Sequence, residues 1–146
     1  TALHWHRLGM WLPPGGHIQT NEDPIEAVLR EVKEETGIAA QIVPTVTMYP
    51  YEHPRQLPPP VTVGVYEIPE LGNPHEHIDF VYFTRPMISS TAILPENDEH
   101  WRWVSKEELL SPSLLLKGPM GITSVPEDVR RLALDAIAST DAIAIA

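Results

Sequence analysis

The stretch from residue 12 to residue 38, LPPGGHIQTNEDPIEAVLREVKEETGI, constrains the fold of this chain more than any other part. Its double proline and double glycine, residues 13–16, force a turn because proline cannot continue a helix or a central strand. The signals that follow are an N-cap, a first-turn proline, a capping-box acid and a C-cap, supplied by Asp23, Pro24, Glu26 and Gly37. The stretch therefore predicts a tight loop followed at once by a helix over residues 24–36.

Acidic side chains crowd one side of this predicted helix. At about 100° per residue, one face collects the residues expected to pack inward, which are Ile25, Val28, Leu29, Val32 and Thr36. Glu31, Glu34 and Glu35 fall together at the edge of that face, where like charges repel by about 0.2–0.5 kcal/mol per pair. Two interpretations stay open: a solvated acidic surface, or carboxylates that converge on a hard cation such as Mg²⁺ or Mn²⁺.

The same stretch resembles the box of the Nudix hydrolase family, G-x5-E-x7-R-E-U-x-E-E-x-G-U, in which U is apolar. The matching residues are Gly16, Glu22, Arg30, Glu31, Val32, Glu34, Glu35, Gly37 and Ile38. The segment Trp11-Leu-Pro-Pro-Gly-Gly, a strand near residues 78–83 and the late run Trp103-Val-Ser also lie where such domains usually have them. The chain is therefore identified as a member of the Nudix (MutT-type) family.

The resemblance implies a metal site and a catalytic role for this box. Glu31, Glu34 and Glu35 would ligate Mg²⁺ or Mn²⁺ together with the backbone carbonyl of Gly15. One of the three glutamates would also act as the base for the attacking water.

The resemblance also implies supporting roles for two further box residues. Arg30 would orient the catalytic glutamates Glu31 and Glu34 by ion pairing, which suits its position one turn before Glu34. Glu22 would tie the loop to the helix or touch the metal through water.

The implied fold is the Nudix fold of the α/β class, a mixed β-sheet sandwiched between helices (α/β/α). The implied reaction is metal-dependent hydrolysis of a nucleoside diphosphate linked to another moiety, in which water attacks phosphorus. The expected substrate is a (d)NTP or a nucleotide-sugar-like diphosphate. The alternative is a non-catalytic Nudix-like nucleotide-binding or regulatory domain, although such domains typically carry eroded boxes.

Several candidate site residues lie outside the box. Some family members take the base or a further metal ligand from a loop before the late tryptophan-containing strand, and here Glu99 is the first choice and Glu96 the second. Arg7 precedes the glycine loop and is a candidate to grip phosphate. His77 and Asp79, two residues apart on one predicted strand, are candidates to face the substrate.

Histidine pairs occur on two predicted strands. His4 and His6 alternate on one strand and His75 and His77 on another, so each pair lies on one side of its strand. A zinc site is one interpretation of such a pair. Ordinary surface or pocket histidines are the favoured one, because the chain has no cysteine and the sequence offers no third converging ligand.

The charge and residue usage limit the partners. The formal net charge is −10 and cysteine is absent. An acidic chain lacks the basic footprint that nucleic acids and anionic membranes require, so we expect a small-molecule nucleoside diphosphate partner, with no nucleic acid and no membrane. The lack of cysteine is compatible with a reducing cytosol, and we expect a cytoplasmic protein. The sequence leaves a homodimer open.

The remaining segments predict one Nudix domain over residues 1–146, with the box at 16–38. We expect strands over residues 3–8, within 38–49, and over 61–68, 78–84 and 100–104. Capping boxes at Ser105 and Ser124 predict a short helix and a C-terminal helix. Family domains usually have one more strand upstream of the box, so we expect either a trimmed segment or a sheet that lacks its N-terminal strand.

Overall fold

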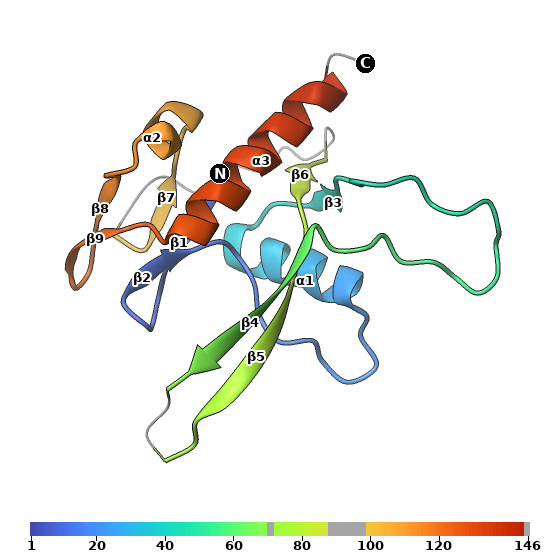
Figure 1. The fold of residues 1–146 in the computed structure, drawn as a ribbon, viewed down its shortest axis with the longest axis horizontal. Coiled ribbons are helices and arrows are strands. Elements are labelled where there is room, and N and C mark those ends of the chain that lie inside the picture. Colours follow the sequence, from blue (N-terminus) through green and yellow to red (C-terminus); the bar gives the residue numbers. More distant parts are fainter. Residues whose placement is uncertain (70–71, 88–98, 145–146) are drawn as a thin grey trace.

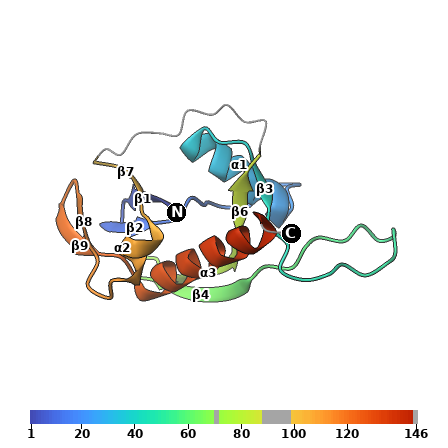
Figure 2. The same ribbon diagram turned by 90° about the horizontal axis from the view of Figure 1, so that it is seen from above.

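The protein was analysed as a computed structural model that describes residues 1–69, 72–87 and 99–144. Its elements run along the chain in the order β1 (Ala2–His6), β2 (Met10–Leu12), α1 (Pro24–Thr36), β3 (Ala40–Ile42), β4 (Thr62–Ile68), β5 (His75–Val81), β6 (Thr84–Pro86), β7 (Trp101–Trp103), α2 (Lys106–Leu110), β8 (Leu115–Gly118), β9 (Gly121–Ser124) and α3 (Glu127–Ala144). Figure 2 shows β1 and β2 between α1 on one side and α3 on the other.

Strand β1 is the centre of a three-stranded sheet in the order β2-β1-β7. It pairs antiparallel with β2, with Trp5 opposite Trp11, and antiparallel with β7, with Leu3 opposite Arg102. Within the described residues the other ladders are the antiparallel pairs β3-β6, β4-β5 and β8-β9. The strand at residues 100–104 that the sequence predicts is thus the partner of the first strand.

The two faces of β1 serve different layers because successive side chains of a strand point to opposite sides. Leu3 is fully buried and belongs to a core with residues of β2, α2, β8, α3 and two connecting loops. These are Trp11, Leu109, Leu116, Val129 and Ala133, with Val104 and Val125 from the loops. The next residue, His4, lies on the other face, where its imidazole Nδ1 is 3.6 Å from a carboxylate oxygen of Glu35 on α1. β1 therefore separates the main core from the glutamate-bearing helix.

Helix α1 has the bounds that its sequence signals predict. Asp23 accepts hydrogen bonds from the backbone N–H groups of Ile25 and Glu26, and Glu26 completes the capping box. At the other end Gly37 adopts a left-handed conformation with φ of 71°, which glycine tolerates without a steric penalty. These caps fix where the helix begins and therefore which side chains share a face.

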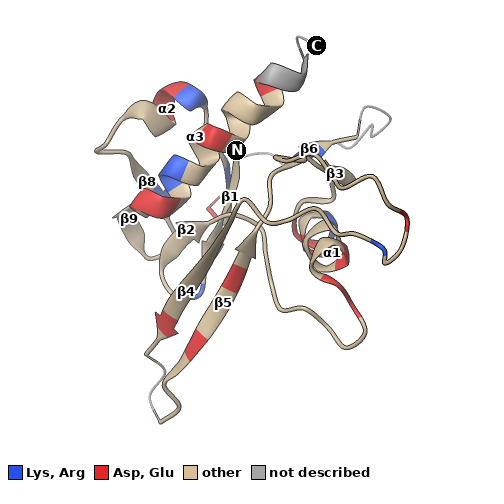
Figure 3. Cartoon of the chain, turned by 45° about the vertical axis from the view of Figure 1, so that its right-hand side comes forward, with Lys and Arg blue, Asp and Glu red and all other residues tan. Residues whose placement is uncertain are grey.

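The buried stripe of α1 runs slightly to one side of the predicted one. Ala27, Val32 and Thr36 are buried, whereas Ile25, Val28 and Leu29 are half-buried. Glu31 and Glu35 follow Ala27 at successive four-residue steps, so both acids are half-buried at the margin of the packed face. Figure 3 shows the acidic residues on α1 and on the loop that leads into it.

Several predicted elements have different limits in the structure. The strand expected within residues 38–49 is reduced to Ala40–Ile42, and β5 begins at His75 rather than at residue 78. The C-terminal helix begins at Glu127, and Ser124 ends β9 in place of capping that helix. Pairing with a neighbouring strand sets the limits of β3 and β5, and single-sequence patterns do not contain that information.

The β4–β5 hairpin projects from the rest of the molecule (Figure 1). One of its faces carries the cross-strand pairs Val63–Phe80 and Val65–Ile78, and all four side chains are exposed. The opposite face contacts the body through Tyr66, whose hydroxyl donates to Asp128 on α3 at 2.8 Å. In the described part of the chain, no helix is both long enough and apolar enough to cross a bilayer.

Candidate active site

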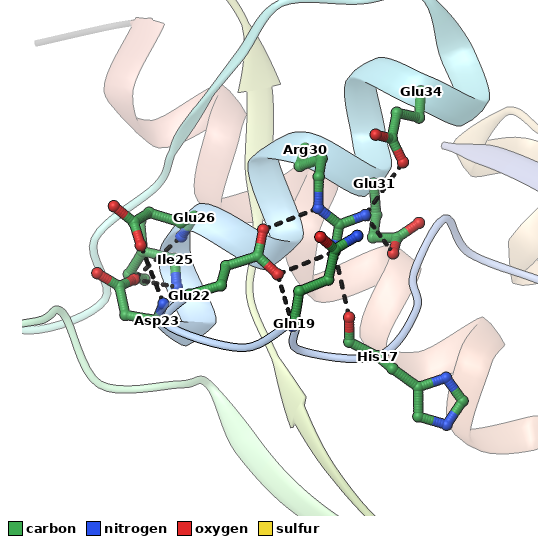
Figure 4. Close-up of polar contacts among 9 residues, drawn as sticks. All are labelled: His17, Gln19, Glu22, Asp23, Ile25, Glu26, Arg30, Glu31 and Glu34. Carbon is green, nitrogen blue, oxygen red and sulfur yellow. Dashed lines mark hydrogen bonds and ion pairs between the residues drawn. The ribbon is translucent and has the colours of Figure 1, made fainter.

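Arg30 is the central residue of the box. Its Nε and Nη2 atoms donate to the two carboxylate oxygens of Glu22, at 2.8 and 3.0 Å, in a bidentate pair. Its Nη1 atom donates to Glu31 at 2.7 Å and to Glu34 at 3.0 Å, and Nη2 also reaches the carbonyl of His17 at 3.1 Å (Figure 4). One guanidinium therefore joins the loop to the helix and fixes two of the three predicted metal ligands.

The ion pairs around Arg30 change two pKa values, that of Arg30 itself and that of Glu22. Hydrogen bonds to Glu22, and next to Glu31, raise the pKa of Arg30. The hydrogen bond from Arg30 lowers the pKa of Glu22, with a further contribution from the backbone N–H of Gln19, which donates to Glu22 at 2.9 Å. Both partners of the bidentate pair are therefore charged at neutral pH.

Glu35 makes a separate set of contacts, with the glycine loop and with β1. The backbone N–H of Gly15 donates to its carboxylate at 3.0 Å, and His4 of β1 is nearby. Burial raises the pKa of Glu35, and the neighbouring charges of Glu31 and Glu34 raise it further. Burial also lowers the pKa of His4, so this histidine does not act as a cationic partner at neutral pH.

Gly16 allows the loop to approach Glu31 closely. A Cβ atom added at Gly16 would overlap the Glu31 carboxylate, whereas one added at Gly15 would meet nothing within 4 Å. An alanine at position 16 would therefore require the Glu31 carboxylate to move, whereas an alanine at position 15 would not.

The predicted convergence of Glu31, Glu34 and Glu35 on one point is not what the structure shows. Among the described residues, no group of three acid, histidine or cysteine side chains has an arrangement that could hold a metal ion. Arg30 lies against one oxygen of Glu31 and one of Glu34, while Glu35 turns to the backbone of Gly15. The reason is that the Arg30 guanidinium forms short ion pairs with its nearest acids.

The donor set nevertheless fits a hard divalent cation. Glu22, Glu31, Glu34 and Glu35 bring four carboxylates, and among the described contacts Arg30 is their only permanently charged partner. Burial raises the pKa of Glu35, and the negative charges of Glu31 and Glu34 add to this effect. Carboxylate oxygens are the ligands that Mg²⁺ and Mn²⁺ prefer, so the residue types of the box suit such an ion.

The candidates outside the box are placed apart from these contacts. Glu99 is exposed, and its described ion pair is with His100 at 3.9 Å rather than with a box glutamate. Glu96 lies outside the described residues. Arg7 is exposed in the turn between β1 and β2. The roles assigned to these three residues stay predictions.

His77 and Asp79 lie on the same face of β5, as their spacing predicts. His77 is half-buried and its ring lies edge-on to that of His17, with 5.2 Å between ring centroids. Asp79 is exposed and pairs across the hairpin with Gly64. His77 is therefore adjacent to the loop of the box.

Sequence reasoning missed the contributions of two histidines to the site. His4 approaches Glu35, and His17, to which no role was attached, contributes both its carbonyl and its ring. Side chains alternate between the two faces of a strand. With Leu3 expected in the core, His4 could have been expected on the opposite face. The contact of His17 with β5 depends on long-range packing, and one sequence carries no signal for it.

The comparisons with known proteins agree with this geometry. The family model described as NUDIX domain matches residues 3–121, which is most of the chain. The chain therefore belongs to the Nudix domain family. The α/β Nudix fold predicted from the sequence is confirmed by this match and by a solved structure, a hydrolase of the NUDIX family from Clostridium perfringens. That structure is 26% identical, covers 94% of this chain and 87% of its own, and has a TM-score of 0.64.

Curated relatives have more specific names. An RNA pyrophosphohydrolase from Erythrobacter litoralis is 32% identical over 108 residues, which is 70% of this chain and 63% of that protein. The phosphatase NudJ of Escherichia coli is 28% identical over 116 residues, 80% of this chain and 64% of its own length. The chain thus spans a little less than two thirds of the length of these relatives.

Proposed function

We propose that this chain hydrolyses the diphosphate bond of a nucleoside diphosphate linked to another moiety, with Mg²⁺ or Mn²⁺ held by Glu31, Glu34 and Glu35. The observation that carries the proposal is the box geometry: Arg30 pairs with Glu22, Glu31 and Glu34, beside a half-buried Glu35. An eroded, purely binding domain would have no need to keep this complete set of contacts. The Nudix relatives named for hydrolysis of pyrophosphate bonds support the same reaction.

The chain's own residues prepare the site. Arg30 restricts the rotamers of Glu31 and Glu34, and Gly16 leaves the space in which the Glu31 carboxylate lies. The N–H of Gly15 orients Glu35, and the carbonyl of Gly15 is the further metal ligand we propose. When bound, the divalent cation would neutralise the charge of the phosphates during attack by water.

A box glutamate serves as the base for the attacking water in this proposal. Glu31 and Glu34 each give one carboxylate oxygen to Arg30, so a second oxygen of each is left for the metal or the water. Glu99 is the alternative base from outside the box. The chemistry asks only that the base lie within hydrogen-bond reach of the water when substrate is bound.

The substrate is proposed by class. A (d)NTP or a nucleotide-sugar-like diphosphate suits an acidic chain, because the metal rather than a basic surface would bind the phosphates. A second candidate is the triphosphorylated 5′ end of RNA, favoured by the relatives named RNA pyrophosphohydrolase at 32% and 33% identity. The RNA candidate departs from the expectation of no nucleic-acid partner. Assays with small nucleotides and with RNA therefore distinguish the two candidate substrates.

The test is a substrate panel with Mg²⁺ or Mn²⁺. It contains dNTPs, ADP-ribose, diadenosine polyphosphates, nucleotide sugars and a short 5′-triphosphorylated RNA, with phosphate and pyrophosphate release as readout. We expect turnover of at least one member, its loss with a chelator, and its loss in the Glu34→Gln/Glu35→Gln double variant. Folded protein that turns over no member, yet binds a nucleotide, would establish the regulatory-domain alternative instead. A double variant with full activity would refute the metal assignment.

A further inference from the structure

His4 of β1 lies next to the carboxylate of Glu35 on the box helix. Its imidazole Nδ1 atom is 3.6 Å from one carboxylate oxygen of Glu35. Only 17% of the His4 side chain and 25% of the Glu35 side chain are exposed. Because solvent screens partly buried groups less than surface groups, the position of this imidazole affects the carboxylate more than a surface neighbour would.

The same imidazole also reaches the loop of residues 13–16. It makes a hydrogen bond with the backbone of Pro13. Because proline has no N–H group, the imidazole must donate this bond and the Pro13 carbonyl must accept it. Two residues further along, the N–H of Gly15 donates to the other carboxylate oxygen of Glu35 at 3.0 Å. His4 and Glu35 therefore hold the loop at neighbouring points.

The His4 ring is held in place by the sheet. It stacks on the ring of Trp101 in β7, with 5.6 Å between ring centroids and 30° between ring planes. His4 pairs with Trp101 on one side of β1 and with Leu12 of β2 on the other. Groups carried by strands are positioned more precisely than groups carried by loops, so His4 can fix the position of the loop that it contacts.

Arg30 does not account for the orientation of Glu35. The described ion pairs of Arg30 on α1 are with Glu31 and Glu34. The described contacts of Glu35 are instead with the loop, through Gly15, and with the His4 ring. The orientation of Glu35 therefore depends on groups outside the Arg30 network.

We propose that His4 is a positioning residue of the candidate active site. Through the Pro13 carbonyl and its approach to Glu35, it fixes the loop of residues 13–16 against the box helix. It thereby places two groups proposed to bind Mg²⁺ or Mn²⁺, the Glu35 carboxylate and the Gly15 carbonyl. The metal part of this inference rests on the proposed function, whereas the placement of the loop and of Glu35 does not.

The first test needs no metal. Amide hydrogen exchange, followed by NMR in the metal-free full chain, reports on the Gly15 N–H that donates to Glu35. His4→Phe keeps a ring for the stack on Trp101 but has no nitrogen, and its Gly15 amide is expected to exchange at least about tenfold faster. His4→Leu is a second variant without a nitrogen and should behave in the same way. Circular dichroism of each variant verifies folding.

His6→Phe is the matched control. His6 lies two residues from His4 on the same face of β1, and its described hydrogen bond is with the backbone N–H of Leu8. Its replacement is expected to leave the Gly15 amide exchanging as in the parent chain. A Gly15 amide that is unprotected in the parent chain itself would overturn the proposal without any variant.

The second test is a calorimetric titration with Mn²⁺ in the absence of substrate. The His4 variants are expected to bind Mn²⁺ about tenfold more weakly than the parent chain, and His6→Phe is expected to bind it equally well. A folded His4 variant with parental Gly15 exchange, or with parental Mn²⁺ affinity, would overturn the proposal. A parent chain that binds no Mn²⁺ would overturn the proposed metal site instead, and the exchange comparison would still decide whether His4 places Glu35.

Discussion

Arg30 and Glu22 form a two-point pair, in which Nε and Nη2 of the arginine donate to both oxygens of the carboxylate. The pair joins the loop before α1 to the middle of the helix. With Nε and Nη2 held by Glu22, the Nη1 atom points at Glu31 and Glu34. The pair with Glu22 therefore sets the direction of the hydrogen bonds to these two glutamates.

Arg30→Lys should therefore reduce turnover about 10–100-fold with little loss of fold, since an ammonium group cannot reproduce the planar fork. Steady-state hydrolysis of the substrate identified in the panel measures the effect. Arg55→Lys is the matched control, because Arg55 is exposed and pairs with Asp23 at the helix start. Equal losses in both variants would mean that the fork at Arg30 has no special role.

Gly16→Ala should lower activity at least about tenfold while changing the melting temperature by only a few degrees. The added methyl group would overlap the Glu31 carboxylate, which is the flexible end of a side chain and can move away. Gly15→Ala should retain more activity, because its Cβ meets nothing within 4 Å and its N–H is kept. Thermal unfolding and turnover of the two variants, measured side by side, test whether the position of Glu31 matters.

Leu109→Ala should destabilise the protein by about 2–5 kcal/mol, because the Leu109 side chain is fully buried in the core shared by α2, α3 and β1. The next residue offers a control: Leu110 is 59% exposed, and its replacement by alanine should have a much smaller effect. Urea unfolding of both variants gives the comparison. Similar midpoints for the two would show that α2 does not contribute to the core.

The stability of the α2 start should depend on pH through Glu108. Hydrogen bonding to the backbone of Ser105, and less strongly to Arg102, lowers the pKa of Glu108 in the folded state. A lowered pKa means that the stabilisation is complete above the ordinary glutamate value of about 4.3 and disappears as pH falls through the folded-state value.

The difference in melting temperature between the parent chain and Glu108→Gln should accordingly be largest near neutral pH and shrink below about pH 4. Glu107→Gln removes the same charge one residue away and is the control. A difference that does not vary with pH would exclude the ionised carboxylate as its cause.

The local parts of the structure were predictable from sequence, and the long-range parts were not. The bounds of α1 follow from Asp23, Glu26 and Gly37, which act within a few residues, and the contact of Arg30 with Glu34 follows from helical spacing. The fixed positions of the box indicated the Nudix family, and the NUDIX domain model that matches residues 3–121 confirms it.

Contacts between distant segments could not be predicted. The pairing of β1 with β7 and the contact of His17 with His77 depend on how the chain packs. The three glutamates Glu31, Glu34 and Glu35 do not converge as expected, and the reason is different. The spacing of residues shows which acids are neighbours, but not which rotamers their carboxylates choose.

The contacts of the candidate site come mainly from one continuous segment, from Gly15 to Glu35. Such contacts close only short loops, so their entropic cost is small compared with that of pairing β1 with β7. The arginine and its acids can therefore come together as soon as α1 forms, early in the folding of the chain. A peptide covering this segment would be expected to keep part of its internal ion pairing even without the sheet.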